Sequence, residues 1–211
     1  MNLYSIMSFF YDLLDKIWFS DKGKNPRDVI ESLIPDKECT VLDMCCGTFS
    51  NGLPIAKKNP NNKVIGIDRS ESMLREAKEK IKKEGLKNVK ICCCDATQTG
   101  LKEESFDYII IGLVLHECDA NLWHRILKEV HRLLKADGRL IILEWEKQTS
   151  MCRKLKFAPL YVLEVLGNMK YFKQMYYSDK SSFFKKYGFE TVEKQECNYT
   201  MVLSMRKTQL R

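Results

Sequence analysis

The sequence of 211 residues lacks several features that would place it in a specialised class. No run of 18 or more apolar residues occurs, so no membrane-spanning helix is expected. The N-terminal apolar stretch has no preceding basic region and contains Asp12 and Asp15, which argues against a secretory signal peptide. The nine cysteines are odd in number and partly adjacent (45–46 and 92–94), which indicates reduced thiols in a cytoplasmic protein and not a disulfide framework.

Metal-ligand spacing is also missing. No C-x-x-C pair occurs. Successive residues of a strand point to opposite faces, so Cys92, Cys93 and Cys94 cannot all reach one ion, and core packing accounts for them better. His124 and His131 lie seven residues apart on one expected helix and are interpreted as structural or surface residues. The sequence therefore predicts no metal site.

Basic charge is unevenly distributed along the chain. Residues 151–211 hold 12 of the 35 Lys and Arg residues but 5 of the 28 Asp and Glu residues, so this part carries the whole net charge of +7. Most of these basic residues stand singly, which argues against a nucleic-acid interface. A solvated basic face and a peripheral contact with an anionic membrane surface both agree with the pattern.

The segment around which the chain is organised is VLDMCCGTFSNG, residues 41–52. It predicts a strand with Asp43 at its carboxyl end, a tight turn at Gly47 that directs backbone N–H groups toward a ligand, and a helix that begins near Ser50. The turn lacks the three glycines of a dinucleotide site, which weakens the interpretation as a nicotinamide oxidoreductase. A second strand ends at Asp68, about 20 residues further on, where an acid meets a ribose hydroxyl group. The pattern favours an adenosyl ligand without a pyrophosphate.

Strands and helices alternate along most of the chain. Strands are expected at about 39–43, 63–68, 88–94, 107–113 and 139–145, and helices at about 26–33, 51–58, 71–84 and 121–135. Asp137 and Gly138 are expected to form the turn before the fifth strand. An aromatic segment of irregular period, residues 151–177, precedes two strands at 189–193 and 199–205 that are expected to pair in antiparallel fashion. This order predicts an α/β fold with a doubly wound, mostly parallel seven-stranded sheet and an antiparallel C-terminal strand.

Five motifs in this order resemble the class I S-adenosylmethionine-dependent methyltransferases. They are VLDMCCGTFSNG (41–52), VIGIDRSESMLREAKEK (64–80), VKICCCDAT (89–97), FDYIIIGLVLHE (106–117) and LKEVHRLLKADGRLIILEW (127–145). The Cys-Cys-Gly-Thr turn and the Asp-x-Ser-x-x-Met-Leu segment are similar to the branch of ubiquinone and menaquinone biosynthesis methyltransferases. The resemblance implies a Rossmann-like single domain with an N-terminal helical lid (1–35), a cofactor-binding core (36–146), and a substrate-side helical insert with C-terminal strands (147–211).

The resemblance implies S-adenosyl-L-methionine as the cofactor and assigns residues to it. They are Asp43, Met44, Cys45 and Gly47 beside its amino-acid end, Asp68 at its ribose, Arg69, Met73, Asp95 and Ala96 around its adenine, and Tyr11 in the lid. The lid corresponds to an amphipathic helix expected at residues 3–19. Phe49 stands where many members have glycine, so its ring is expected to point away from the cofactor or the turn to bulge.

Few catalytic side chains are expected, because methyl transfer depends mainly on holding the acceptor in line with the reactive carbon. His116 is the candidate to take a proton from the acceptor, and Glu144 is a second candidate. Both are also explained as residues that only shape the pocket. The segment LVLHECD at 113–119 replaces an Arg-Asn stretch of the quinone-pathway enzymes, which argues against carrying over their substrate.

The sequence therefore predicts a cytoplasmic enzyme that transfers a methyl group to a small or lipophilic, quinone-like molecule. A module or partner subunit that binds an S-adenosyl ligand without turnover is the alternative. An RNA methyltransferase is disfavoured because no RNA-binding module is appended. Methylation of arsenite is a remote option that would rest on Cys45, Cys46, Cys118, Cys152 and Cys197. The sequence indicates neither the acceptor atom nor the oligomeric state.

Overall fold

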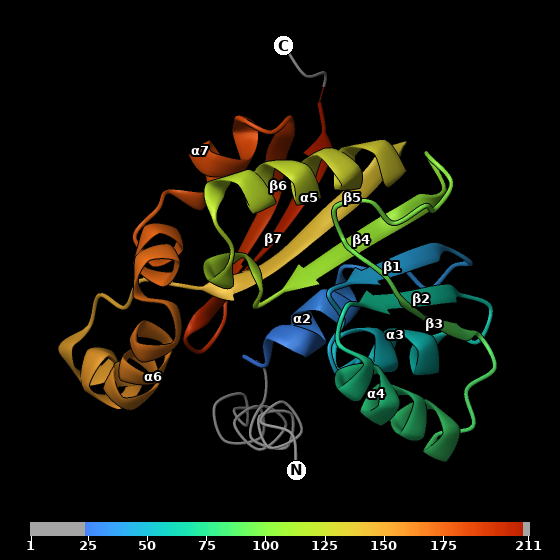
Figure 1. The fold of residues 1–211 in the computed structure, drawn as a ribbon, viewed down its shortest axis with the longest axis horizontal. Helices are drawn as coiled ribbons and strands as arrows, with labels where there is room; N and C mark the ends of the chain where they lie inside the picture. The colour runs from blue at the N-terminus through green and yellow to red at the C-terminus, as the bar shows by residue number, and fades with distance from the viewer. Residues whose placement is uncertain (1–23, 209–211) are drawn as a thin grey trace.

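The computed structural model describes residues 24–208, apart from the side chains of residues 163 and 166–169 (Figure 1). The strands are β1 (Thr40–Met44), β2 (Lys63–Asp68), β3 (Val89–Cys93), β4 (Phe106–Gly112), β5 (Leu134–Trp145), β6 (Phe189–Glu196) and β7 (Thr200–Lys207). The helices are α2 (Pro26–Ser32), α3 (Gly52–Lys58), α4 (Glu71–Lys83), α5 (Ala120–Leu133), α6 (Met151–Tyr176) and α7 (Lys180–Lys185), with a 3-10 turn η1 (Leu115–Glu117). The helix expected at 3–19, and Tyr11 within it, lie outside the described residues.

The helices begin and end where the sequence provides caps. The side chains of Asn25, Ser70 and Asp119 accept hydrogen bonds from the first turns of α2, α4 and α5. Gly85 and Gly188 follow α4 and α7 with φ of +65° and +78°, a conformation that glycine adopts without a Cβ penalty. The expected helix limits are therefore correct to within one or two residues.

The seven strands form one sheet in the order β3-β2-β1-β4-β5-β7-β6. All neighbouring strands run parallel except β7, which pairs in antiparallel fashion with both β5 and β6. This confirms the predicted fold class. The strand order reverses between β1 and β4, and open α/β sheets bind ligands at the carboxyl ends of strands beside such a point.

Alternate residues of the central strands build two separate cores. Leu42 of β1 and Ile109 of β4 face α5 and α7, whereas Val41 and Ile110 face α2, α3 and α4. The side chains in both sets are almost fully buried. Helices therefore cover both faces of the sheet, as the doubly wound topology requires (Figure 1).

One expectation about β5 is wrong. Asp137 and Gly138 were expected to form a turn before the strand, but the strand already begins at Leu134, which pairs with Phe106. The register is irregular between this pair and the next, so the turn-forming residues make a bulge inside β5. A Cβ at Gly138 would lie 2.9 Å from the Leu134 side chain, so glycine permits the close approach.

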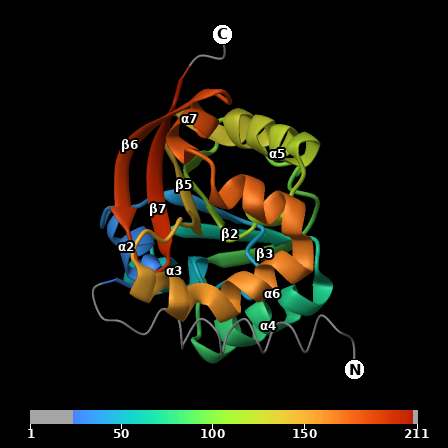
Figure 2. The same cartoon turned by 90° about the vertical axis from the view of Figure 1, so that its left-hand side faces the viewer.

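Helix α6 doubles back on itself. The hydroxyl oxygens of Tyr161 and Tyr177 lie 3.4 Å apart, and the rings of Phe157 and Tyr176 stack with centroids 5.9 Å apart. In a straight helix, 19 residues would separate the latter pair by about 28 Å. The chain must therefore bend back between Tyr161 and Phe172, and Figure 2 shows the two limbs of the resulting hairpin.

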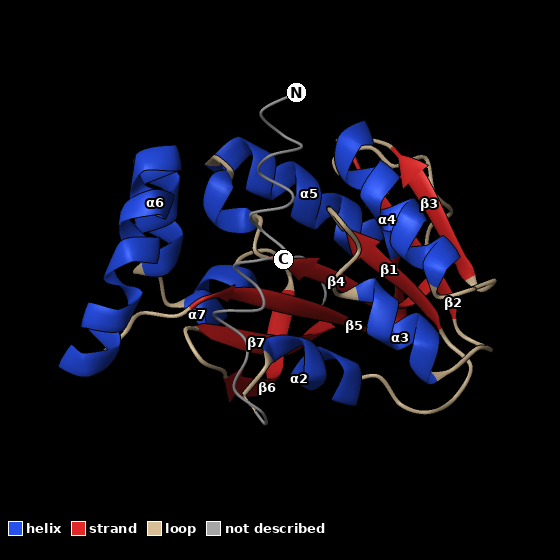
Figure 3. Cartoon of the chain, turned by 90° about the horizontal axis from the view of Figure 1, so that it is seen from below, coloured by secondary structure: helices blue, strands red, loops and turns tan. Residues whose placement is uncertain are grey.

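The α6 hairpin packs against η1 at the side of the molecule opposite β3 (Figure 3). Its inner aromatic side chains form a third core with Trp145 at the end of β5. The apolar residues of 151–177 are irregularly spaced because this segment forms two short helical limbs that bury different faces. The expected helical cover is present, in the form of this hairpin.

Candidate functional site

The turn after β1 is held against the end of β2 by its own backbone N–H groups. The N–H of Gly47 donates to Oδ2 of Asp68 at 2.9 Å, and the N–H of Cys46 donates to the carbonyl of Ile67 at 2.9 Å. The other carboxylate oxygen of Asp68 accepts from the N–H of Ser70 at 2.8 Å. Asp68 therefore joins the turn after β1 to the start of α4 and brings the two sequence motifs together.

Asp43 is a buried carboxyl group at the carboxyl end of β1. Its side chain has no exposed surface, and Oδ2 accepts a hydrogen bond from the N–H of Gly52 at 2.9 Å. Its Oδ1 has no hydrogen-bond partner among the described residues. Burial raises the pKa of Asp43 to about 7, against the opposing effect of the Gly52 hydrogen bond. A cationic group at the turn would favour the ionised form.

The turn adopts left-handed backbone conformations at Cys45, Gly47 and Phe49, with φ of +58°, +52° and +65°. The Phe49 ring is fully buried, and it fills the space above Gly52 and Gly66, where an added Cβ would approach it to within 2.9 Å or less. A Cβ built on Gly47 would meet nothing within 4 Å. The ring of Phe49 thus lies in the core while space remains open at Gly47, an arrangement that matches the first of the two expected alternatives, a ring directed away from the ligand side of the turn.

Of the remaining expected cofactor residues, Arg69 directly follows β2, Asp95 and Ala96 follow β3, and Met73 lies in the first turn of α4. Asp95 is exposed after β3, and its hydrogen bonds from Thr97 lower the pKa of its carboxyl group. Arg69 is exposed, whereas Met73 and Ala96 are half-buried.

The side chain of Met44 has no exposed surface, so a ligand at the turn would meet its backbone and not its thioether. Cys45 is half-buried and packs against the core below α5. Burial raises the pKa of its thiol far above the ordinary value, so the thiol is protonated at neutral pH. Among the described residues, no group of three or more His, Cys, Asp and Glu side chains is placed to hold a metal ion.

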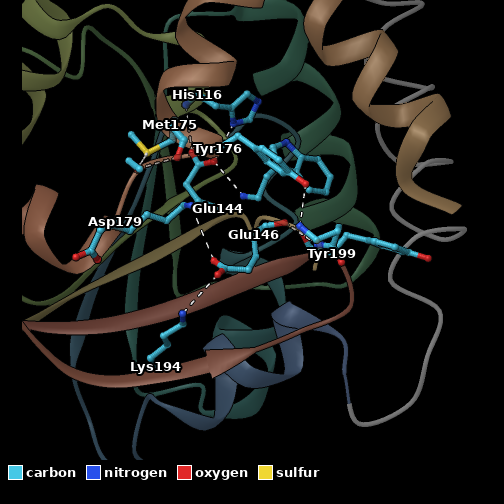
Figure 4. A network of polar contacts seen from close by, with 12 residues as sticks. His116, Glu144, Glu146, Met175, Tyr176, Asp179, Lys194 and Tyr199 are labelled. Carbon is cyan, nitrogen blue, oxygen red and sulfur yellow. Dashed lines mark hydrogen bonds and ion pairs between the residues drawn. The ribbon is translucent and has the colours of Figure 1, made fainter. Parts of the chain in front are cut away.

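His116 and Glu144 form a buried pair on the neighbouring part of the same edge (Figure 4). Nδ1 of His116 lies 2.9 Å from Oε2 of Glu144. Glu144 also accepts hydrogen bonds from the backbone N–H groups of Leu115, His116 and Trp145, at 2.9, 3.3 and 3.2 Å. These donors fix the carboxylate at the end of β5 and bring together the two candidates for proton transfer.

A third charged side chain reaches the same histidine from α6. Oε2 of Glu164 lies 3.4 Å from Nε2 of His116. Burial disfavours the charged imidazole, but Glu144 and Glu164 outweigh it and raise the pKa of His116 well above its ordinary value. Burial would likewise raise the pKa of Glu144, but the pair with His116 prevails and lowers it. The two carboxylates therefore favour the imidazolium form of His116, with Nδ1 hydrogen-bonded to Glu144 and Nε2 facing Glu164.

A second charged group lies beside this pair. Lys180 is almost fully buried, and its Nζ is 3.9 Å from Oε2 of Glu146, whose other oxygen lies 3.5 Å from Lys194 (Figure 4). Burial lowers the pKa of Lys180. The rings of Trp145 and Phe172 lie around His116, with centroids 6.3 and 5.9 Å away. Charged groups and flat aromatic surfaces thus occur together at this end of the site.

The sequence interpretation missed Glu164. It is the single acidic residue between Glu146 and Asp179, within a segment otherwise apolar and basic. A lone carboxylate in such a segment indicates a specific hydrogen-bonding or ion-pair partner, because burying an unpaired carboxylate costs free energy. The identity of that partner could not be read from the sequence, since His116 lies 48 positions away.

Comparisons with known proteins identify the family. The model of a methyltransferase-domain family matches residues 35–197. The chain is 34% identical to a demethylmenaquinone methyltransferase of Geobacillus stearothermophilus over 150 residues, which cover 70% of this chain and 63% of that protein. It is 33% identical to the protein of the same name from Lactococcus lactis over 173 residues, 74% of this chain and 68% of that protein. The chain belongs to the methyltransferase-domain family, and it spans somewhat under two thirds of the length of the first of these relatives.

Solved structures show the same fold. A SAM-dependent methyltransferase from Aquifex aeolicus matches with a TM-score of 0.73 and 21% identity, over 97% of this chain and 98% of that one. The Burkholderia thailandensis 1,6-didemethyltoxoflavin-N1-methyltransferase, solved with bound S-adenosylhomocysteine, matches with a TM-score of 0.66 and 16% identity, over 98% and 88% of the two chains. Within residues 24–208, none of the helices combines the length and apolar character that crossing a membrane requires.

The turn fits the S-adenosyl ligand that the family implies. The unpartnered oxygen of buried Asp43 suits a cationic amino group, and the open space at Gly47 admits a ligand against the backbone. Asp68 lies at the end of β2, where its carboxylate would meet the ribose. The donors and acceptors of this edge thus correspond to a nucleoside with a charged amino-acid end.

Proposed function

We propose that the protein transfers a methyl group from S-adenosyl-L-methionine to a small, lipophilic, quinone-like molecule. The observation that carries the proposal is the link from Gly47 to Asp68 beside buried Asp43, because it joins a backbone-lined turn to two carboxylates at adjacent strand ends. The names of the Geobacillus and Lactococcus relatives support a quinone-like acceptor.

The bound cofactor would supply an electrophilic methyl group, and the chain has to position and shield the reactants. Asp43, Gly47 and Asp68 would hold the cofactor, with Arg69, Met73, Asp95 and Ala96 proposed around its adenine and Tyr11 above it. Orienting an acceptor in line contributes up to about 7–11 kcal/mol of the barrier reduction, so few reactive side chains are needed. The α6 hairpin would exclude water from the acceptor side.

His116 is the proposed catalytic residue on the acceptor side, with Glu144 as its anchor. As an imidazolium it provides a hydrogen-bond donor and a positive charge. In this form it cannot act as a base, because both ring nitrogens already carry a proton. The rings of Trp145 and Phe172 lie beside it, and aromatic surroundings suit an acceptor with an unsaturated ring. The site therefore favours an acceptor that is flat and has a polar oxygen.

The test is a thermal-shift titration with S-adenosylhomocysteine, with NAD in parallel. A ligand at 100 times its Kd adds about 2.7 kcal/mol of stability, or a rise of roughly 5–10 °C for a domain of this size. We expect this rise with S-adenosylhomocysteine and its loss in Asp68→Ala. A rise with NAD alone would reject the proposal in favour of an oxidoreductase.

Turnover separates the enzyme from a module that binds the ligand without reaction. Transfer of a labelled methyl group to a chemically reduced naphthoquinone, detected by mass spectrometry, is the expected result. Stabilisation by S-adenosylhomocysteine without any labelled product from a panel of reduced quinones and phenols would favour the binding module.

A cytoplasmic location with peripheral membrane contact belongs to the same proposal. The basic residues of 151–211 would bring the protein to the surface where a lipophilic acceptor is dissolved. Co-sedimentation with phosphatidylglycerol vesicles, but not with phosphatidylcholine vesicles, is expected at low salt. Equal behaviour with both would remove this part of the proposal without affecting the reaction.

A further inference from the structure

The two carboxylates that contact His116 are held very differently. Glu144 lies 2.9 Å from Nδ1 and is fixed by three backbone N–H groups, with no exposed surface. Glu164 lies 3.4 Å from Nε2, and its side chain is 18% exposed. Among the described side chains, Glu164 has His116 as its ion-pair partner. Glu144 is thus held by several hydrogen bonds, whereas Glu164 is held by its longer ion pair with His116.

The elements that carry Glu164 and Glu144 differ in the same way. It comes from the bend region of the α6 hairpin, between Tyr161 and Phe172, which covers η1 from outside. Glu144 instead lies on a central strand whose neighbours are β4 and β7. A side-chain rotation or a small shift of the hairpin would remove Glu164 from Nε2 while leaving the pair of His116 and Glu144 intact.

Charge defines what can take the place of Glu164. The imidazolium, Glu144 and Glu164 together carry one negative charge, and an anionic acceptor in place of Glu164 would leave this charge unchanged. The rings of Trp145 and Phe172, both almost fully buried, lie against His116 and give its surroundings an aromatic character. An oxygen anion carried on a flat ring matches both conditions.

We propose that Glu164 occupies the binding position of the acceptor's oxygen, and that an acceptor with an ionised hydroxyl group on a flat unsaturated ring displaces it from Nε2 of His116. This inference rests on the proposed methyl transfer. It makes Glu164 a specificity-determining residue and gives His116 the role of an anion-holding donor.

An acceptor that enters as an anion needs no base in the site. Its own electron pair forms the bond to the methyl carbon at the ionised oxygen. The electron pair of the broken carbon–sulfur bond remains on sulfur. His116 keeps its proton throughout, in agreement with its contacts to two carboxylates.

The experiment measures binding of two probes at pH 7 in the presence of saturating S-adenosylhomocysteine, by calorimetry. The probes are 2-hydroxy-1,4-naphthoquinone, which is ionised at this pH, and its methyl ether, which is not. Glu164→Ala should bind the hydroxylated probe about tenfold more tightly than the unmodified protein, because a competing charged hydrogen bond is removed. The methyl ether should bind both proteins equally.

Two further variants complete the test. Glu79→Ala removes an exposed carboxylate of α4 and should leave the affinities for both probes unchanged. His116→Gln in the Glu164→Ala background should abolish the tenfold gain. The thermal stabilisation of each variant by S-adenosylhomocysteine reports whether its cofactor site remains intact.

Equal or weaker binding of the hydroxylated probe by Glu164→Ala, or no binding by any variant, would overturn the inference while S-adenosylhomocysteine still stabilises the protein. Loss of that stabilisation in the unmodified protein would instead remove the proposed function. A second measurement is independent of affinity: the imidazole nitrogen resonances of His116 should remain those of a doubly protonated ring when the hydroxylated probe is bound. Conversion to a neutral ring would also overturn the proposal.

Discussion

The turn after β1 and the α6 hairpin lie along the same edge of the sheet, but they are built in different ways. The turn joins residues close in sequence, with backbone N–H groups directed to the carboxylates of Asp43 and Asp68. The hairpin side joins residues far apart, because His116, Glu144 and Glu164 come from η1, β5 and α6. The first is held together by main-chain hydrogen bonds, and the second by buried side-chain charge.

This difference suits the two ligands proposed for the edge. Every enzyme of a cofactor-sharing family meets the same cofactor, and backbone groups at a tight turn recognise it whatever side chains surround them. The acceptor differs between enzymes, so its site is made of side chains whose charge and shape can vary. The comparison predicts that variants of the turn change cofactor affinity, whereas variants of the hairpin side change stability and acceptor choice.

The largest effect is expected on the hairpin side, from Glu144→Gln. It replaces a buried anion that accepts from several N–H groups, and it leaves the imidazolium of His116 without its anchor. Breaking a buried pair costs about 3–5 kcal/mol, or a fall in Tm of roughly 6–20 °C. Differential scanning calorimetry of the two proteins measures the change in Tm.

The control for Glu144→Gln is Glu190→Gln, which breaks an exposed pair with Arg206 and should cost at most about 1 kcal/mol. A similar small loss for both variants would mean that the buried charges contribute little, and the contrast between the two sides would disappear.

The next effect is expected at the turn, from Asp68→Ala. It leaves the N–H groups of Gly47 and Ser70 without their acceptor and removes the proposed ribose contact. Affinity for S-adenosylhomocysteine should fall by about 2–3 kcal/mol, which is roughly 30- to 150-fold. Asp36→Ala, at an exposed position, should leave the affinity unchanged. An unaltered Kd for Asp68→Ala would separate the turn from cofactor binding.

A smaller effect is expected from pH, through Asp43. Its pKa is raised to about 7, so it is mostly neutral at pH 6 and mostly ionised at pH 8. If the ionised form binds the cationic end of S-adenosylhomocysteine, affinity should rise about tenfold across this interval. Titration calorimetry at several pH values measures the slope, and Asp43→Asn should remove it. A flat profile in the unmodified protein would show that Asp43 does not face the charged end.

The same raised pKa has the opposite consequence for the ligand-free protein. The folded state binds the proton of Asp43 more tightly than the unfolded state does, so this contribution to stability is complete below about pH 4. It is lost as the pH rises toward 7. Ligand binding and intrinsic stability should therefore change in opposite directions over the interval just below neutral pH.

The turn side could be predicted from the sequence in some detail, and the hairpin side could not. Strand limits, helix limits and the positions of Asp43 and Asp68 at strand ends follow from short-range patterns, in which each signal lies beside the residue it places. The pairing of His116 with Glu164 depends on where α6 bends, which is set by ring packing between limbs that the sequence does not align. The turn expected at Asp137 failed similarly, because pairing with β4 extended the strand through it.

The smallest effect is expected at Phe49, and it tests whether the turn keeps its left-handed backbone conformation without the buried ring. Phe49 has φ of +65°, which costs about 1–2 kcal/mol for a residue with a Cβ. Phe49→Ala and Phe49→Gly both remove the buried ring, so the difference between them isolates the backbone. Glycine usually destabilises a protein relative to alanine, but here Phe49→Gly should be about 1 kcal/mol the more stable of the two in urea unfolding. Alanine as the more stable variant would mean that the left-handed turn relaxes once the ring is gone, and that the ring itself imposes the conformation of the turn.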